Sequence, residues 1–135
     1  MNNKLLALGI PTYKRPDYAI SSLKDAISLD TYDEIILSCN SFEPLIEKFI
    51  NSLENKEKIV YKLQKENVGL SQNYSDIIKL TSCDYVHIIS DEDHLIQDNV
   101  QDFHSFLGQN NDFSLFLVSA LDENGLISRL SPKLI

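Results

Sequence analysis

Three acidic side chains stand together in the segment Ser90-Asp91-Glu92-Asp93-His94. Asp91 and Asp93 are two positions apart, so their carboxylates point the same way if the segment is extended. Such oxygen ligands suit Mg²⁺ or Mn²⁺, which these sites commonly share with the phosphates of a substrate. A solvated acidic turn before a helix is the competing interpretation, because acidic groups are favourable near a helix N-terminus. The pattern alone leaves both interpretations open.

The histidines add alternatives to this acidic segment. His94 can act as a further metal ligand or phosphate contact, or it can be a polar surface residue. His87 falls within an apolar run and is interpreted as a core or sheet-edge residue, and His104 is interpreted as helix surface. An EF-hand calcium loop is excluded, because the glycine and the distal glutamate that it requires are missing.

Alternating apolar runs predict the elements that position the acidic segment. Short apolar runs indicate strands, and apolar residues at helical spacing indicate amphipathic helices. The expected strands are residues 5–11, 34–38, 58–63, 85–89 and 113–121. The expected helices are residues 17–29, 44–53, 71–80 and 96–107, and residues 122–125 are typical of a turn.

This order predicts one α/β domain over residues 1–135, with a mostly parallel sheet and helices on both of its faces. The runs 34–38 and 85–89 are nearly all apolar, as strands covered on both faces are. Ligands of such sheets bind beyond the carboxyl ends of the strands. The loops expected to carry function are therefore 11–16, 39–43, 66–73 and 90–94.

Composition narrows the classes of partner. The chain of 135 residues is 43% hydrophobic and 24% charged, which is typical of one globular domain. Its formal net charge of −8 disfavours nucleic acid, because it repels phosphate backbones. No apolar run reaches the roughly 20 residues of a transmembrane helix. Cys39 and Cys83 show no zinc or disulfide pattern, so a cytoplasmic location is expected.

Four loop motifs, in order over about residues 4–107, resemble those of glycosyltransferase family 2. Gly9-Ile10-Pro11-Thr12-Tyr13-Lys14-Arg15-Pro16 resembles the family's P-T-Y-N-R-like run, and Leu37-Ser38-Cys39-Asn40-Ser41 resembles its second-strand end. Glu66-Asn67-Val68-Gly69-Leu70-Ser71-Gln72-Asn73-Tyr74 resembles the E-N-x-G-x-x-x-N segment, and Asp91-Glu92-Asp93 resembles the D-x-D motif.

The resemblance implies a truncated GT-A-like, Rossmann-like fold and an inverting, metal-dependent glycosyltransferase. Such an enzyme transfers a sugar from a nucleotide-diphosphate sugar to an acceptor hydroxyl. Mn²⁺ or Mg²⁺ would be held by Asp93, with Asp91 assisting it or contacting ribose. A UDP-sugar donor is favoured, with a glycan or lipid-linked acceptor in surface polysaccharide synthesis. The implied place is cytoplasmic, including a peripheral position at the inner face of the membrane.

The resemblance also implies a set of donor-binding residues. Thr12 would offer its hydroxyl, Tyr13 would pack on the nucleobase, and Arg15 would contact phosphate or acidic groups. Each has a plainer alternative: a surface ion pair for Arg15, a turn at the start of a helix for Gly69, and local capping or loop bracing for the asparagines. The nucleotide-sugar-binding set is Pro11, Thr12, Tyr13, Arg15, Asn40, Asn67, Gly69, Asn73 and Asp91.

Cys39 departs from the family pattern, in which an aspartate at this position contacts the base or ribose. A thiol cannot accept hydrogen bonds as a carboxylate does. Base recognition would then fall to Asn40 or Ser41, or the donor would differ from UDP-sugar. On this interpretation Cys39→Asp strengthens the binding of uridine nucleotides.

The general base and the acceptor pocket are expected beyond Ile135, because family members carry them downstream of the D-x-D motif. Asp122 and Glu123 are explained by turn chemistry. A non-catalytic or degenerate nucleotide-sugar-binding domain is the main alternative. A sugar nucleotidyltransferase is disfavoured, since loop 11–16 has no glycine, and a receiver-like signalling domain is disfavoured, since the acidic cluster follows the fourth strand.

Overall fold

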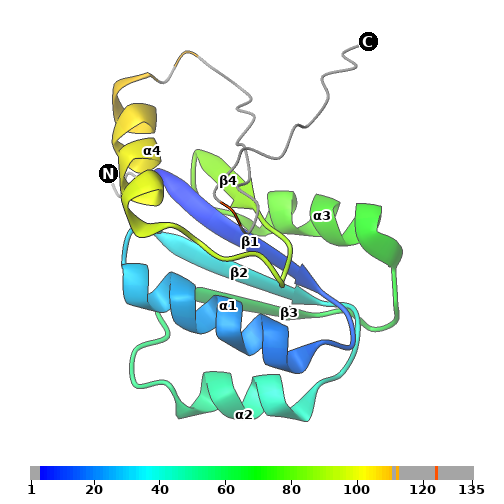
Figure 1. Cartoon of the computed structure of the whole chain (residues 1–135). Helices are drawn as coiled ribbons and strands as arrows, with labels where there is room; N and C mark the ends of the chain where they lie inside the picture. Colours follow the sequence, from blue (N-terminus) through cyan, green and yellow to red (C-terminus); the bar gives the residue numbers. More distant parts are fainter. Residues whose placement is uncertain (1–3, 111, 113–123, 125–135) are drawn as a thin grey trace.

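The computed structural model describes residues 4–110, 112 and 124, and strands and helices alternate along them (Figure 1). The strands are β1 (Leu6–Thr12), β2 (Glu34–Cys39), β3 (Ile59–Leu63) and β4 (Tyr85–Ile88). The helices are α1 (Pro16–Leu29), α2 (Pro44–Ser52), α3 (Gly69–Leu80) and α4 (Gln97–Gln109). Each matches an expected element to within a few residues. The expected strand 113–121 lies outside the described residues, as does the expected turn 122–125 apart from Asn124.

The four strands form one parallel sheet in the order β3-β2-β1-β4. Leu8 of β1 lies opposite Ile35 of β2 on one side and His87 of β4 on the other. The chain therefore builds outward from β1 to β3 and then crosses back to place β4 on the far side of β1. This reversal creates a switch point between β1 and β4, where open α/β sheets bind their ligands.

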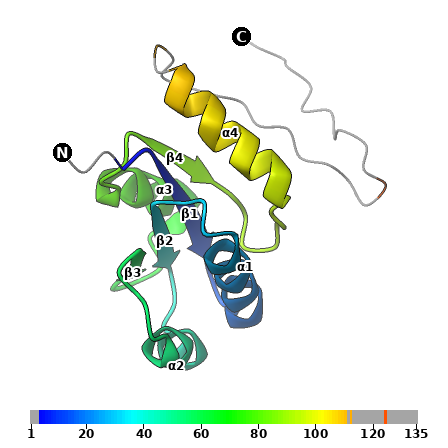
Figure 2. The ribbon, with the colours of Figure 1, turned by 90° about the vertical axis from the view of Figure 1, so that its left-hand side faces the viewer.

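Helices cover both faces of the sheet, as the sequence predicted. Side chains of α1, α2 and α4 pack on one face, against the β1 residues Leu6, Leu8 and Ile10. Helix α3 packs on the other face, where Ile77 contacts the core around Ala7. Figure 2 shows α1 and α4 on one side of the sheet and α3 on the other. The alternation along β1 follows directly from the two-residue period of a strand.

Glycine at position 9 lets α3 approach the sheet closely. A Cβ atom added at Gly9 would lie 2.5 Å from Cγ2 of Ile77. Real Cβ atoms do not come so near another carbon, so any larger residue must displace α3 or the strand. The absence of a side chain at Gly9 therefore sets the spacing between β1 and α3.

The central and outer strands differ in burial. All six residues of β2 are buried, as expected of a strand covered on both faces. The residues of β4 are only half-buried, which differs from the expectation for run 85–89. Within the described part of the chain, β4 lies at an edge of the sheet, and this position explains the difference.

Histidines anchor α4 at the amino end of the sheet. His87 of β4 shares a 2.9 Å hydrogen bond with the Tyr32 hydroxyl, and its ring meets the edge of Phe103 on α4. His104 lies 3.6 Å from the Asp33 carboxylate, which also accepts hydrogen bonds from the backbone N–H groups of Leu5 and Leu6. His87 is thus a satisfied, half-buried residue, and His104 is a half-buried contact rather than open helix surface.

Candidate functional site

The switch point brings together residues that are far apart in the sequence. Thr12 ends β1, and Asp91 follows β4. The Thr12 hydroxyl donates a 2.7 Å hydrogen bond to Oδ2 of Asp91, and both residues are buried. The first and fourth predicted loops therefore meet where the fold places ligands.

Arg15 joins the same two loops by ion pairs. Its Nη2 lies 2.9 Å from Oδ1 of Asp91, and its Nη1 lies 3.1 Å from Oε2 of Glu92. Arg15 stands directly before Pro16, the first residue of α1, so the start of the helix fixes the base of the side chain. The guanidinium supplies the positive charge that a buried aspartate requires.

Ser22 is a supporting residue that sequence reasoning missed. Its hydroxyl donates a 2.7 Å hydrogen bond to the backbone carbonyl of Asp91. Ser22 is buried on the face of α1 that also carries Ala19 and Leu23. A hydroxyl on the apolar face of an amphipathic helix was the available signal, because such a group requires a partner.

Asp93 lies in a different environment from Asp91. It is exposed, and its Oδ2 accepts a 2.8 Å hydrogen bond from the backbone N–H of Ser90, in a tight turn closed by Asp93 N–H to the Ser90 carbonyl. His94 faces Asp25 of α1 at 3.3 Å, which matches its interpretation as a polar surface residue. Among the described residues, no group of three or more His, Cys, Asp or Glu side chains is placed to hold a metal ion.

Hydrogen bonds connect the first loop to the second at Lys14, a residue with an unusual backbone conformation. Lys14 has a φ of 54°, which is unusual for a residue with a side chain. Its N–H donates to the Ser41 hydroxyl at 2.9 Å, and that hydroxyl donates to Glu43 at 2.8 Å. Strained backbone clusters at functional sites, although Asp30 has a similar φ of 51° simply because it ends α1. Ser41, which the sequence offered as a base contact, helps to hold this conformation.

The asparagines of the predicted site brace the second and third loops. Asn40 accepts from Val68 N–H and donates to the Gly69 carbonyl, both at 3.3 Å. Asn67 accepts from Gly69 N–H at 3.0 Å, and Gly69 begins α3 with a φ of 80°. Asn73 is buried and donates to the Ser38 carbonyl at 3.0 Å. The capping and bracing alternatives therefore describe the contacts that these side chains make.

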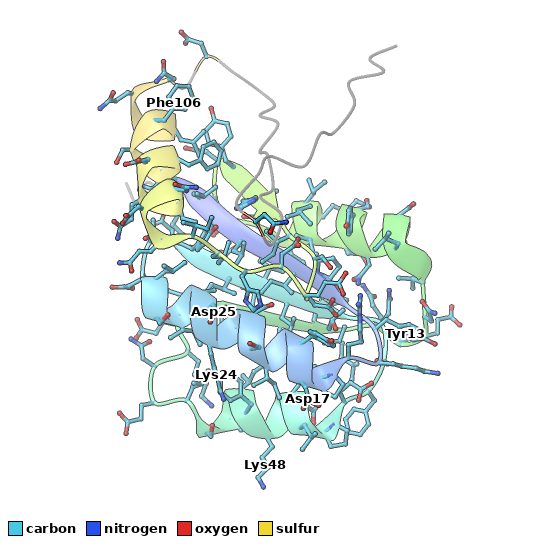
Figure 3. All side chains as sticks on the ribbon, viewed as in Figure 1. Tyr13, Asp17, Lys24, Asp25, Lys48 and Phe106 are labelled. Atoms are coloured by element: carbon cyan, nitrogen blue, oxygen red, sulfur yellow. The ribbon has the colours of Figure 1, made fainter. Side chains whose placement is uncertain are left out.

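The residues of the first loop differ in their exposure to solvent. Pro11 is buried, whereas Tyr13 is 41% exposed, with the Lys14 ammonium 5.1 Å from its ring centroid. Figure 3 shows Tyr13 beyond the tip of β1, at the end of the sheet opposite Phe106. The predicted site residues with exposed side chains are Tyr13, Arg15, Asn67 and Asp93.

Cys39 lies in the apolar core. It is the last residue of β2 and shares the face of Ile35 and Leu37, toward α1 and α2. Burial is the main reason that the pKa of the Cys39 thiol is raised to about 12, and the carboxylates of Glu43 and Asp91 add to the effect. The thiol therefore packs inside the protein, and the next residue, Asn40, is the one that joins the loops.

Comparison with known proteins identifies the fold. No protein-family model matches the chain, and no curated protein matches it. A crystal structure of S. aureus TarS 1-349 aligns with a TM-score of 0.65 at 16% identity, over 79% of this chain and 33% of that one. A second S. aureus TarS structure gives 0.67 at 15% identity, over 78% of this chain and 20% of that one. This chain thus spans a third or less of either.

At this level of identity the likeness shows the fold alone. The described chain has a Rossmann-like α/β fold with a parallel sheet and helices on both faces, which confirms the predicted fold class. Membership of family 2, the donor sugar and the metal stay predictions. Within the described residues, no helix is both long and apolar enough to cross a bilayer.

Proposed function

We propose that this chain is the donor-binding part of a glycosyltransferase. The whole enzyme would transfer a sugar from a nucleotide-diphosphate sugar, favoured as a UDP-sugar, to a glycan or lipid-linked acceptor hydroxyl, with inversion. The general base that such a transfer needs would come from outside the described residues. This chain would supply the donor site of a cytoplasmic enzyme of surface polysaccharide synthesis.

One observation carries the proposal. Four loops with family-2-like motifs converge at the carboxyl ends of the strands, and Thr12 and Arg15 join two of them through Asp91 at the switch point. Asp91 is buried, its Oδ2 accepts the hydrogen bond from Thr12, and its Oδ1 is ion-paired with Arg15. Ligands of α/β sheets bind at this position, which supports a nucleotide site.

We propose that a divalent cation binds at this site through Asp93. Asp91 is buried and already paired with Arg15, so we assign it a supporting role next to the ribose. Asp93 is exposed at the same loop and would hold Mn²⁺ or Mg²⁺ together with donor phosphate oxygens and water. Once bound, the ion would neutralise charge that develops on the leaving diphosphate.

A non-catalytic nucleotide-sugar-binding domain is the second candidate. The family's base-contacting aspartate is replaced by Cys39, whose thiol lies in the core. A donor site that lacks this carboxylate would bind the nucleotide through Tyr13 and the loop backbone. Such a domain would bind nucleotide but would not release sugar to any acceptor.

Substitution of Asp93 tests the proposed site. We expect Asp93→Ala to abolish manganese-dependent binding of UDP in calorimetry, with an unchanged circular dichroism spectrum. Asp102→Ala is the matched control, because Asp102 is an exposed carboxylate on α4, and this variant should bind like the unmodified chain. Equal manganese-dependent affinity for UDP in both variants would contradict the assignment of the metal to this loop.

A further inference from the structure

Arg15 bridges two carboxylates that are buried to very different extents. The Asp91 side chain is 0% exposed, whereas the side chains of Arg15 and Glu92 are 45% and 57% exposed. The two ion pairs have similar lengths, at 2.9 Å and 3.1 Å. They therefore differ in solvent access rather than in geometry.

The buried pair is the one that must persist. Asp91 is also held by the hydroxyls of Thr12 and Ser22, so it cannot turn toward solvent. Removing its cation would leave a buried charge without compensation, which is strongly destabilising. The pair with Glu92 is a surface ion pair, and such pairs contribute little. Of the two partners of Arg15, Glu92 is the one that an incoming anion can replace.

We infer that Glu92 occupies the place at Arg15 that the donor's diphosphate would take, and that it must leave Arg15 when the donor binds. This inference rests on the proposed donor site. Phosphate and carboxylate groups match the guanidinium fork in the same way, so an anion can take over the Nη1 contact while Nη2 keeps Asp91. Glu92 thereby competes with the donor and holds Arg15 in position until the donor arrives.

The negative charge of Glu92 opposes the binding of anions in a second way. The chain carries a net charge of −8, and Glu92 lies between Asp91 and Asp93 in the segment that must accept an anion. Anionic ligands other than a diphosphate would meet the same barrier. The residue thus restricts the site to ligands that can both displace it and recruit a cation.

Glu92→Gln tests the inference, because the substitution removes the charge and keeps the shape. We expect UDP and inorganic pyrophosphate to bind about fivefold more tightly to this variant at low salt, in calorimetry with manganese present. Glu57→Gln is the matched control. Glu57 is exposed just before β3, at the opposite end of the sheet, so this variant changes the net charge equally and should bind like the unmodified chain.

The Arg15→Lys variant then shows whether this gain in affinity depends on the guanidinium group. This variant keeps a cation for Asp91, and we expect adding Glu92→Gln to it to bring less than a twofold gain, because the fork that two anions share is gone. If the unmodified chain binds UDP and Glu92→Gln binds no more tightly than Glu57→Gln, the inference is wrong and the donor site stands. If no variant binds UDP or pyrophosphate, both are wrong.

Discussion

Asp91 and Asp93 are two positions apart, yet they lie in opposite environments. Asp91 is buried and held by Thr12 and Arg15, whereas Asp93 is exposed and bonded within its own turn. The sequence predicted that both lie at the end of a strand. It could not predict which one turns inward, because that depends on hydroxyl and guanidinium groups supplied by distant segments.

The Cys39 side chain points into the core, and this changes the effect that we expect of Cys39→Asp. Cys39→Asp would place a carboxylate in the core, beside the negative charges of Glu43 and Asp91. We therefore expect it to lower the free energy of unfolding by about 3 kcal/mol, and not to strengthen uridine nucleotide binding. Urea denaturation at pH 7 measures the loss.

Cys39→Ala is the control, since it removes the same thiol without adding a charge, and we expect a distinctly smaller loss. A Cys39→Asp protein as stable as Cys39→Ala, with tighter UDP binding, would mean that this side chain reaches the ligand. The direction of Cys39 was predictable from its neighbours. In a strand, residues two apart share a face, and Ile35 and Leu37 are apolar.

At the scale of elements, the close contact of α3 with β1 gives a stability prediction. We expect Gly9→Ala to lower the free energy of unfolding by about 1–3 kcal/mol, because the new Cβ overlaps Ile77. Chemical denaturation checks the size of the loss. In an Ile77→Ala background the same substitution should cost much less, since the overlapping atom is then absent.

Gly108→Ala is the matched control for that substitution. Gly108 lies in α4, and its added Cβ would come no closer than 3.9 Å to Leu5. Alanine is the better helix former by about 1 kcal/mol, so this variant should be as stable as the unmodified chain or more stable. Equal losses at the two glycines would contradict the packing of α3 described above.

The stability of the protein should depend on pH through His87, which lies where β4 contacts α4. Burial lowers the pKa of His87 from its ordinary value of 6.5, and the charge of Asp93 offsets part of this effect. The unfolded chain then binds the proton more readily than the folded chain. The free energy of unfolding should therefore have its full value above about pH 6.5 and decrease as the pH falls below 6.5.

His87→Gln should reduce this acid-induced loss, because glutamine can still bond the Tyr32 hydroxyl but does not titrate. Urea denaturation at two pH values on either side of 6.5 measures the difference. An identical pH profile for His87→Gln and the unmodified chain would overturn this prediction.

Element positions were more predictable than the contacts of the site. Apolar periodicity located the strands and helices from residue 5 to residue 109, and the alternation gave the parallel sheet. Helix α3 begins at Gly69, two residues before the predicted start, and the positive φ of this glycine turns the chain into the helix. The half-burial of β4 was not predictable, because an apolar run does not reveal whether its strand is central or at an edge.

At the scale of the whole molecule, charge and fold act against each other. The net charge of −8 repels an anionic ligand, whereas the proposed donor site lies at the switch point between β1 and β4 and has to bind one. Arg15 pairs with two carboxylates, so little of its positive charge is left for a diphosphate until Glu92 leaves. We propose that a divalent cation offsets this repulsion, so that nucleotide binding at this site depends on the cation.

Calorimetric titration of the whole chain with UDP, GDP, CDP and dTDP, each with and without manganese, tests that claim most directly. We expect one nucleotide to bind, and to bind measurably only when manganese is present. Absence of binding by all four to a folded chain would contradict the donor site, and equally tight binding without manganese would contradict the role given to the cation.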